Sequence, residues 1–141
     1  MAGMIVTGHG SFASGITSGL KLLAGELKNY RAVDFTEDDS SETLAKRLKE
    51  AVNQLKECEG IVIFADLTGG SPFNESIKMK MENLEKLEVI GGANLPAVLD
   101  CYMTRMMQDE TETLARASLE AGKHAMVLFE QSGNTEDEYE E

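Results

Sequence analysis

The sequence predicts an α/β protein with a doubly wound, mainly parallel sheet that has helices on both faces. Short apolar runs alternate along the chain with segments in which apolar residues recur at helical spacing. The most hydrophobic run, Ile61–Ala65, is typical of a central parallel strand that is covered on both faces. Alternating strands and helices imply a parallel sheet joined by right-handed crossovers. With 141 residues, of which 42% are hydrophobic, the chain can build one domain around one core.

Five apolar runs are expected to form strands. In chain order they are residues 4–6, 31–35, 61–65, 87–90 and 124–129. The first four are placed in the order 2-1-3-4, in which the first and third strands are neighbours and their connections diverge to opposite faces. The last run is expected to be an antiparallel edge strand, because a sheet that ends at its fourth strand leaves an open edge.

Helices are expected between these runs, and most of them begin at residue types that cap helix N-termini. The predicted caps are Ser11, Asp39 with Glu42 as a capping box, Ser71 followed by Pro72, and Asn94. Pro96 fits the fourth helix because proline is tolerated in the first turn. Glycine often ends a helix, so Gly25 is expected to end the first helix, and Gly122 the fifth, over residues 111–121.

The formal net charge of −12 argues against nucleic acid and anionic membranes as partners and favours a basic protein surface. Part of the acidity lies in residues 131–141, which we expect to be a disordered tail after a domain of residues 1–130. No apolar run is long enough for a membrane span and no signal peptide precedes the first strand, so a cytoplasmic protein is expected. Cys58 and Cys101 are too few for a disulfide framework or a zinc site, and both are expected to be buried apolar residues.

A histidine and an aspartate follow the two strands that are expected to be neighbours. His9 stands between Gly8 and Gly10 after the first apolar run, and Asp66 follows the third run directly. The flanking glycines remove side-chain cover, so the imidazole should be exposed at the carboxyl end of the sheet, where open α/β sheets bind ligands. A carboxylate that accepts one ring N–H fixes the tautomer and leaves the lone pair of the other nitrogen free. The pair therefore predicts an oriented nucleophile.

The turns around this pair suit a phosphoryl group. Hydroxyl and backbone donors for its three oxygens are expected from Gly10, Ser11, Thr68, Gly69 and Ser71, with two helix N-termini nearby. No set of metal ligands accompanies these residues, and no cofactor is predicted.

Three motifs resemble the IIA component of the sugar phosphotransferase system (PTS), of the mannose, fructose, sorbose and N-acetylgalactosamine family. They are T-G-H-G at residues 7–10, D-L-T-G-G-S-P-F-N at residues 66–74 and A-N-L-P at residues 93–96, and the resemblance extends over residues 4–129. It implies a phosphorelay in which the histidine-containing phosphocarrier protein phosphorylates the active histidine, here His9. That histidine passes the group to the IIB component, which phosphorylates sugar entering through the membrane permease components. The family's aspartate that hydrogen-bonds the active histidine corresponds to Asp66.

The resemblance also implies a homodimer in which a last strand is exchanged between subunits, and residues 124–129 occupy that place. The residues alone leave two arrangements open, an edge strand within one chain and an exchanged arm between two chains.

Other interpretations of the same motifs also follow from the sequence. A phosphorelay subunit that serves a soluble kinase, such as dihydroxyacetone kinase, would resemble this chain in fold and histidine, and a regulatory module would have its phosphorylation state read by a partner. The spacing Gly8-x-Gly10-x-x-Ala13, with Asp34 further on, matches a dinucleotide-binding fingerprint, but the chain has no room for a separate substrate domain. A histidine phosphatase would carry an arginine where Gly8 stands.

Overall fold

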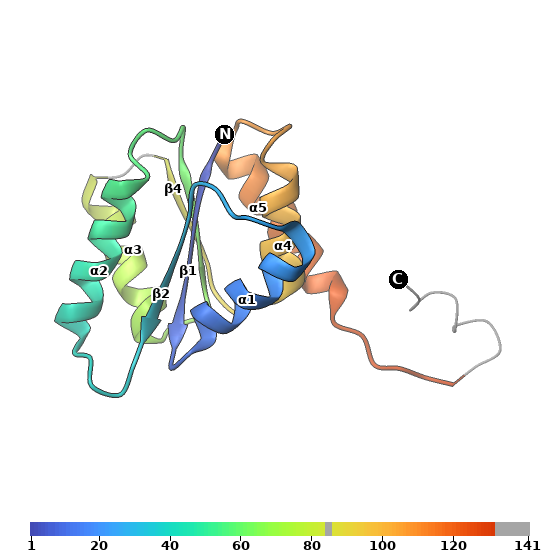
Figure 1. Cartoon of the computed structure of the whole chain (residues 1–141), viewed down its shortest axis with the longest axis horizontal. Coiled ribbons are helices and arrows are strands. Elements are labelled where there is room, and N and C mark those ends of the chain that lie inside the picture. The colour runs from blue at the N-terminus through green and yellow to red at the C-terminus, as the bar shows by residue number, and fades with distance from the viewer. Residues whose placement is uncertain (84–85, 132–141) are drawn as a thin grey trace.

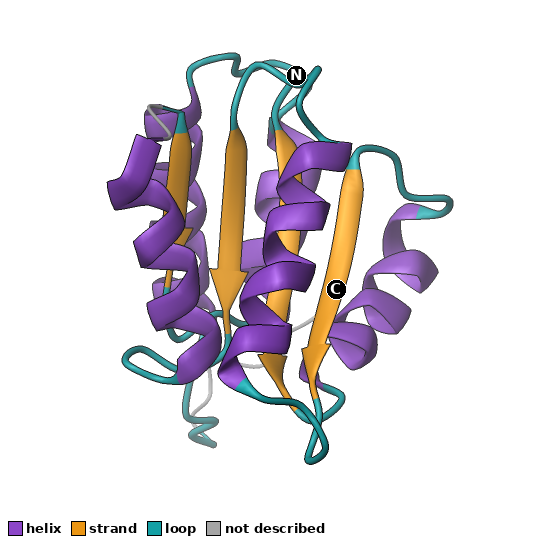
Figure 2. Ribbon diagram, turned by 90° about the vertical axis from the view of Figure 1, so that its left-hand side faces the viewer, coloured by secondary structure: helices purple, strands orange, loops and turns teal. Residues whose placement is uncertain are grey.

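The computed structural model describes residues 1–83 and 86–131 and shows a sheet between two layers of helices (Figure 1, Figure 2). The elements in chain order are β1 (Gly3–His9), α1 (Phe12–Ala24), β2 (Tyr30–Phe35), α2 (Ser41–Gln54), β3 (Ile61–Ala65), α3 (Ser71–Asn83), β4 (Leu87–Ile90), α4 (Leu95–Thr104) and α5 (Thr111–Ala125). The strands lie in the order β2-β1-β3-β4, and each described pair is parallel. The predicted α/β class and strand order are confirmed.

The two faces of the sheet carry separate hydrophobic cores, because side chains alternate along each strand. In β1, Met4 and Val6 belong to the core under α1, α4 and α5, whereas Ile5 belongs to the core under α2 and α3 (Figure 1). β3 is buried along its whole length, as expected of a central parallel strand. Cys101 is buried as predicted, and burial raises the pKa of its thiol to about 12, whereas Cys58 is only half-buried.

β1 continues beyond the predicted run of residues 4–6 and ends at His9. Thr7 is fully buried, and its hydroxyl donates a hydrogen bond to the carbonyl oxygen of Val33 at 2.8 Å, which offsets the cost of burying a polar group. His9 pairs with Phe35 of β2. The histidine is therefore the last residue of a central strand rather than a turn residue beyond it, and strand pairing fixes its backbone.

Two of the predicted helix ends are confirmed. Asn94 Oδ1 accepts a hydrogen bond from the amide of Ala97 at 3.0 Å, with Pro96 in the first turn of α4. Gly25 follows α1 with φ of 79°, and its amide donates to the carbonyl oxygen of Lys21.

Ser11 occupies the predicted N-cap position of α1 but makes no side-chain capping hydrogen bond. The other two predicted caps, Ser71 and Asp39, are wrong. α3 begins at Ser71 itself, one position earlier than expected, and the carbonyl oxygen of Gly70 accepts from the amide of Asn74 at 2.8 Å. These two helix starts therefore depend on groups other than their own serine hydroxyls.

The predicted capping box of Asp39 with Glu42 does not form, because Ser40 caps α2 by accepting the amide hydrogen of Thr43 at 3.1 Å. Asp39 Oδ2 accepts instead from the amide and hydroxyl of Thr36, at 2.8 and 2.9 Å, and from Arg47. These bonds, those from Thr36 most of all, lower the pKa of Asp39. Asp39 thus closes the turn after β2.

α5 continues through Gly122 to Ala125, so the predicted end at Gly122 is wrong. A Cβ atom on Gly122 would lie 2.7 Å from Cβ of Ala97 and 2.9 Å from Oδ1 of Asn94. The Asn94 side chain also donates to the carbonyl oxygen of Gly122 at 2.9 Å. The glycine is therefore needed for the close approach of α5 to the start of α4, not as a helix stop.

The predicted last strand, residues 124–129, is wrong for the single chain. His124 and Ala125 form the end of α5, and residues 126–131 have no regular secondary structure and lead away from the domain (Figure 1). Because α5 runs on past Gly122, this segment leaves the helix pointing away from the sheet, and β4 is the last strand of the described sheet. Residues 132–141, which hold most of the predicted acidic tail, lie outside the described residues.

The end of the sheet opposite His9 is held by a buried arginine, Arg105. Its guanidinium donates hydrogen bonds to the carbonyl oxygens of Ala2 and Asn29 at 3.0 and 3.1 Å, and its Cζ lies 4.1 Å from the ring centroid of Tyr102. Burial lowers the pKa of Arg105. The side chain joins the end of α4 to the starts of β1 and β2, so this end of the molecule has a structural role.

Candidate functional site

The structure brings His9 and Asp66 into direct contact at the carboxyl end of the sheet. β1 and β3 are neighbours, Thr7 pairs with Ala65, and Asp66 is the next residue after β3. Nδ1 of His9 lies 3.0 Å from Oδ2 and 3.2 Å from Oδ1 of Asp66, and the backbone amide of His9 also donates to Oδ2 at 2.8 Å. One carboxylate therefore binds both the backbone and the ring of the histidine.

This contact depends on the glycine before His9. A Cβ atom on Gly8 would lie 2.8 Å from Cγ of Asp66 and 2.6 Å from the ring of Phe12. Any side chain at this position would displace the carboxylate or the first turn of α1. Gly8 thus allows Asp66 to reach the histidine. The flanking glycines predicted an exposed imidazole, but they did not predict that Gly8 makes room for this carboxylate.

Three groups surround the His9 imidazole, and its side chain is 46% exposed, against 15% for Asp66. Asp66 binds Nδ1, and the ring of Phe35 makes an edge contact with a centroid distance of 5.7 Å and an interplanar angle of 66°. The backbone of Gly70 lies against the third side, because a Cβ atom there would be 2.8 Å from Cε1 and 3.4 Å from Nε2. Within residues 1–83 and 86–131, no group makes a hydrogen bond to Nε2.

The residues predicted to bind phosphoryl oxygens fall on both turns that flank His9. Gly10 and Ser11 form the exposed turn between β1 and α1, while Thr68, Gly69 and Ser71 lie between β3 and the start of α3. The amide of Gly10 is already used, because it donates to the carbonyl oxygen of Phe35 at 2.7 Å. Gly10 has φ of 58° and Gly69 φ of 86°, so both turns use the left-handed backbone region that favours glycine.

The two helix N-termini beside His9 differ in whether a side chain already accepts hydrogen bonds from their free amides. Oδ1 of Asp34, near the end of β2, accepts the amide hydrogen of Ser14 at 3.0 Å, so a carboxylate already satisfies the first turn of α1. This explains why the Ser11 side chain makes no capping hydrogen bond. α3 begins directly after Gly70, whose backbone lies against the edge of the ring that holds Nε2. An anion bound to Nε2 is therefore favoured by α3 rather than by α1.

Asp34 also bears on the dinucleotide interpretation, which needs this carboxylate for a ribose hydroxyl. Its hydrogen bond to Ser14 gives it a structural function at the start of α1. That arrangement does not favour a dinucleotide site.

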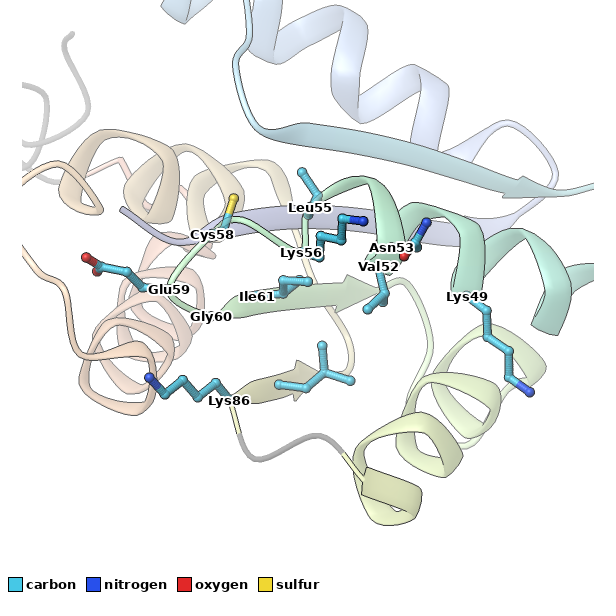
Figure 3. A pocket seen from close by; sticks show the side chains of 11 residues that line it. Lys49, Val52, Asn53, Leu55, Lys56, Cys58, Glu59, Gly60, Ile61 and Lys86 are labelled. Carbon is cyan, nitrogen blue, oxygen red and sulfur yellow. The ribbon is translucent and has the colours of Figure 1, made fainter.

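Other features of the described residues lie apart from this pair. No group of three or more His, Cys, Asp or Glu side chains among them could hold a metal ion. A cavity of about 410 Å³ opens at the opposite end of the sheet, where Lys49, Lys56 and Lys86 surround an apolar floor that includes Val52 and Leu55 (Figure 3). The described part of the chain contains no helix with the length and hydrophobicity needed to cross a membrane.

Sequence reasoning missed Phe35 and Gly70 as neighbours of the histidine, and Asp34 as the residue that caps α1. Asp34 and Phe35 end the predicted second strand, and the carboxyl ends of parallel strands meet at one edge of the sheet. Their position near His9 could therefore have been predicted from the sequence. The contact between Gly70 and the ring depends on the path of the loop after β3, for which the sequence gives no comparable signal.

The close approach of Gly70 predicts that Gly70→Ala displaces the His9 ring without unfolding the protein. The methyl group would sit 2.8 Å from Cε1, and the ring is the more mobile partner because it is half exposed. Gly15→Ala is the matched control, since nothing lies within 4 Å of a Cβ atom there. Proton NMR measures the result, because the chain has only two histidines and the exposed His124 gives an internal reference. An unchanged His9 signal in Gly70→Ala would contradict the packing described here.

Comparison with known proteins gives the family. The model of the PTS system fructose IIA component matches residues 3–118. A crystal structure of PTS component EIIA from Streptococcus agalactiae is similar with a TM-score of 0.84 and 28% identity, over 90% of this chain and 96% of that chain. The fructose-specific EIIA component of Bacillus subtilis is 27% identical over 105 residues, which cover 74% of this chain and 71% of that protein.

The mannose-specific EIIAB component of Escherichia coli is 27% identical over 123 residues, which are 87% of this chain. The match covers only 38% of that longer relative. Since the family model covers most of the chain and the fold agrees with a solved EIIA component, the chain belongs to the PTS system fructose IIA component family, as its three motifs predict.

Proposed function

We propose that this chain is a phosphocarrier of a sugar PTS, in which His9 accepts a phosphoryl group from the histidine-containing phosphocarrier protein and passes it to the IIB component. IIB then phosphorylates sugar that enters through the membrane permease components, and the chain works in the cytoplasm. One observation carries the proposal. The His9 ring is held at Nδ1 by Asp66, while Nε2 has no hydrogen-bond partner among the described residues.

The chemistry follows from which ring nitrogen is engaged. Asp66 accepts a hydrogen bond from Nδ1–H, so the neutral ring keeps its lone pair on Nε2. Nε2 attacks phosphorus, and a new N–P bond forms while the N–P bond of the donor's phosphohistidine breaks and its electron pair returns to the donor ring. The phosphorylated imidazole gains positive charge, which the carboxylate of Asp66 stabilises. In transfer to IIB, a new bond forms between phosphorus and the acceptor atom of IIB while the N–P bond on His9 breaks and its electron pair returns to Nε2.

We propose that the phosphoryl oxygens bind at the start of α3. The hydroxyl of Thr68 and the backbone of Gly69 come from the loop whose Gly70 touches the ring, and the hydroxyl of Ser71 comes from the first residue of α3. The helix dipole favours a dianion at this end. Ser11 is the remaining predicted donor on the other turn, and the Gly10 amide is excluded by its bond to Phe35.

The assignment predicts that His9→Gln abolishes phosphorylation while His124→Gln does not. Nδ1 of His9 is hydrogen-bonded to a carboxylate at 3.0 Å, whereas Nδ1 of His124 is hydrogen-bonded to the carbonyl oxygen of Glu120 and lies 4.0 Å from its carboxylate. Each variant is incubated with the upstream relay proteins and labelled phosphoenolpyruvate, and the bound label is tested for the acid lability and alkali stability of a phosphoramidate. His124 is the other histidine of the chain, so it is the matched control. Acid-labile label on a folded His9→Gln protein would disprove the assignment.

We also propose that two copies form a dimer by exchanging the segment after α5. Met126, Val127 and Leu128 are 85%, 58% and 81% exposed in the single chain, and β4 is an open edge of the described sheet. An apolar segment that is unpacked in one chain gains burial by adding to the sheet edge of another, and a two-fold arrangement satisfies both edges together.

Removing residues 126–141 should therefore produce a monomer or an aggregating protein, whereas removing residues 132–141 should leave the dimer intact. The shorter of the two truncated chains ends at Ala125, the last residue of α5, so all the described helices and strands remain. Light scattering at micromolar concentration measures the mass, which for the full chain should be about twice 15.4 kDa. A full-length monomer under these conditions would rule out the exchange.

A further inference from the structure

Phe35 contacts His9 from the strand on the side away from Asp66. β1 lies between β2 and β3, so β2 brings Phe35 to one side of the histidine and β3 brings Asp66 to the other. The two rings meet edge-on at a centroid distance of 5.7 Å and an interplanar angle of 66°, the geometry that aromatic pairs prefer. Phe35 is half-buried and packs against the core under α2 and α3, which limits its own movement.

The backbone fixes this contact as well. The amide of Gly10 donates to the carbonyl oxygen of Phe35 at 2.7 Å, and His9 is paired with Phe35 in the β1–β2 register. The backbone of Phe35 therefore has a fixed position relative to the histidine. A substitution of the Phe35 side chain leaves this hydrogen bond and the strand pairing in place.

Asp66 alone does not fix the plane of the imidazole. Nδ1 lies within 3.2 Å of both carboxylate oxygens, so the ring could turn about this contact and still keep a hydrogen bond. Such a turn would move Nε2 away from Gly70 and from the start of α3. Gly70 and Phe35 are the two further contacts on the ring, and Phe35 is the one that a side-chain substitution can remove.

We propose that Phe35 is a positioning residue for phosphoryl transfer, which holds the His9 ring so that Nε2 faces the start of α3. This inference rests on the proposed phosphocarrier function. Phe35 acts through His9 and needs no contact with the phosphoryl group. Phosphoryl transfer requires close alignment of the attacking nitrogen with phosphorus, and a small displacement of that nitrogen slows the reaction strongly.

The test compares Phe35→Leu with Phe35→Tyr. Leucine keeps an apolar side chain against the core but removes the ring, whereas tyrosine keeps the ring. Phe35→Leu should slow phosphorylation by the phosphocarrier protein roughly tenfold in kcat with little change in KM, and Phe35→Tyr should stay close to the unaltered protein. Val52→Ala is the control for lost stability, because Val52 is half-buried against the same core and lies on α2, away from His9.

Proton NMR of the unphosphorylated protein gives a second readout that does not depend on the relay. Phe35→Leu should weaken the nuclear Overhauser contact between the His9 ring and Gly70, which depends on where the ring lies, and leave the His124 signals unchanged. Phe35→Tyr and Val52→Ala should alter neither. A Phe35→Leu protein that is folded and has an unaltered kcat would overturn the positioning role, and a rise in KM alone would assign Phe35 to partner docking instead. If the unaltered protein takes up no label, the proposed function fails, and the NMR comparison still decides whether Phe35 orients the ring.

Discussion

The site depends on one interaction, the binding of the Asp66 carboxylate to both the backbone amide and Nδ1 of His9. This interaction exists because the strand order makes β1 and β3 neighbours, which brings residues 57 positions apart in sequence together at one edge of the sheet. It also requires the absence of a side chain at Gly8. A polar side chain that is largely buried must be satisfied, and the histidine supplies the hydrogen-bond donors that Asp66 needs. Fold and chemistry are therefore linked through a single carboxylate.

Stabilising and functional interactions are separated along the strands. At the amino ends, Arg105 is fully buried and joins three segments through backbone carbonyl oxygens. At the carboxyl ends, His9 is half exposed and one ring nitrogen is left without a partner among the described residues. In the proposed relay the nucleophile must meet a partner protein, so it cannot be buried, and its orientation must come from neighbours that are themselves fixed. Asp66, Phe35 and Gly70 contact the His9 ring from the end of β3, from β2 and from the loop before α3, and we propose that they provide this orientation.

The sequence was sufficient for the class, the strand order and the pairing of His9 with Asp66, because alternating periodicity and the topology of parallel sheets restrict where strand ends meet. It failed where a residue type serves two purposes. Gly122 was interpreted as a helix stop, but it allows α5 to pack closely on α4, and only the packed structure distinguishes these uses. Asp34 was considered for a ribose contact and instead caps α1, since its reach to Ser14 depends on how β2 lies beside β1. The segment after α5 is apolar enough for a strand, yet residues 126–131 pair with no strand of the described sheet.

The most direct test of this account is the position of the ring proton on His9 at a pH where the ring is neutral. Nitrogen NMR on ¹⁵N-histidine-labelled protein distinguishes a protonated from an unprotonated ring nitrogen, and the chain has only two histidines to assign. The account predicts that His9 carries its proton on Nδ1, with Nε2 unprotonated, and that Asp66→Asn weakens this preference in a folded protein. A proton on Nε2 of the unaltered protein would contradict the account, because the nitrogen assigned to attack phosphorus would then have no lone pair to use.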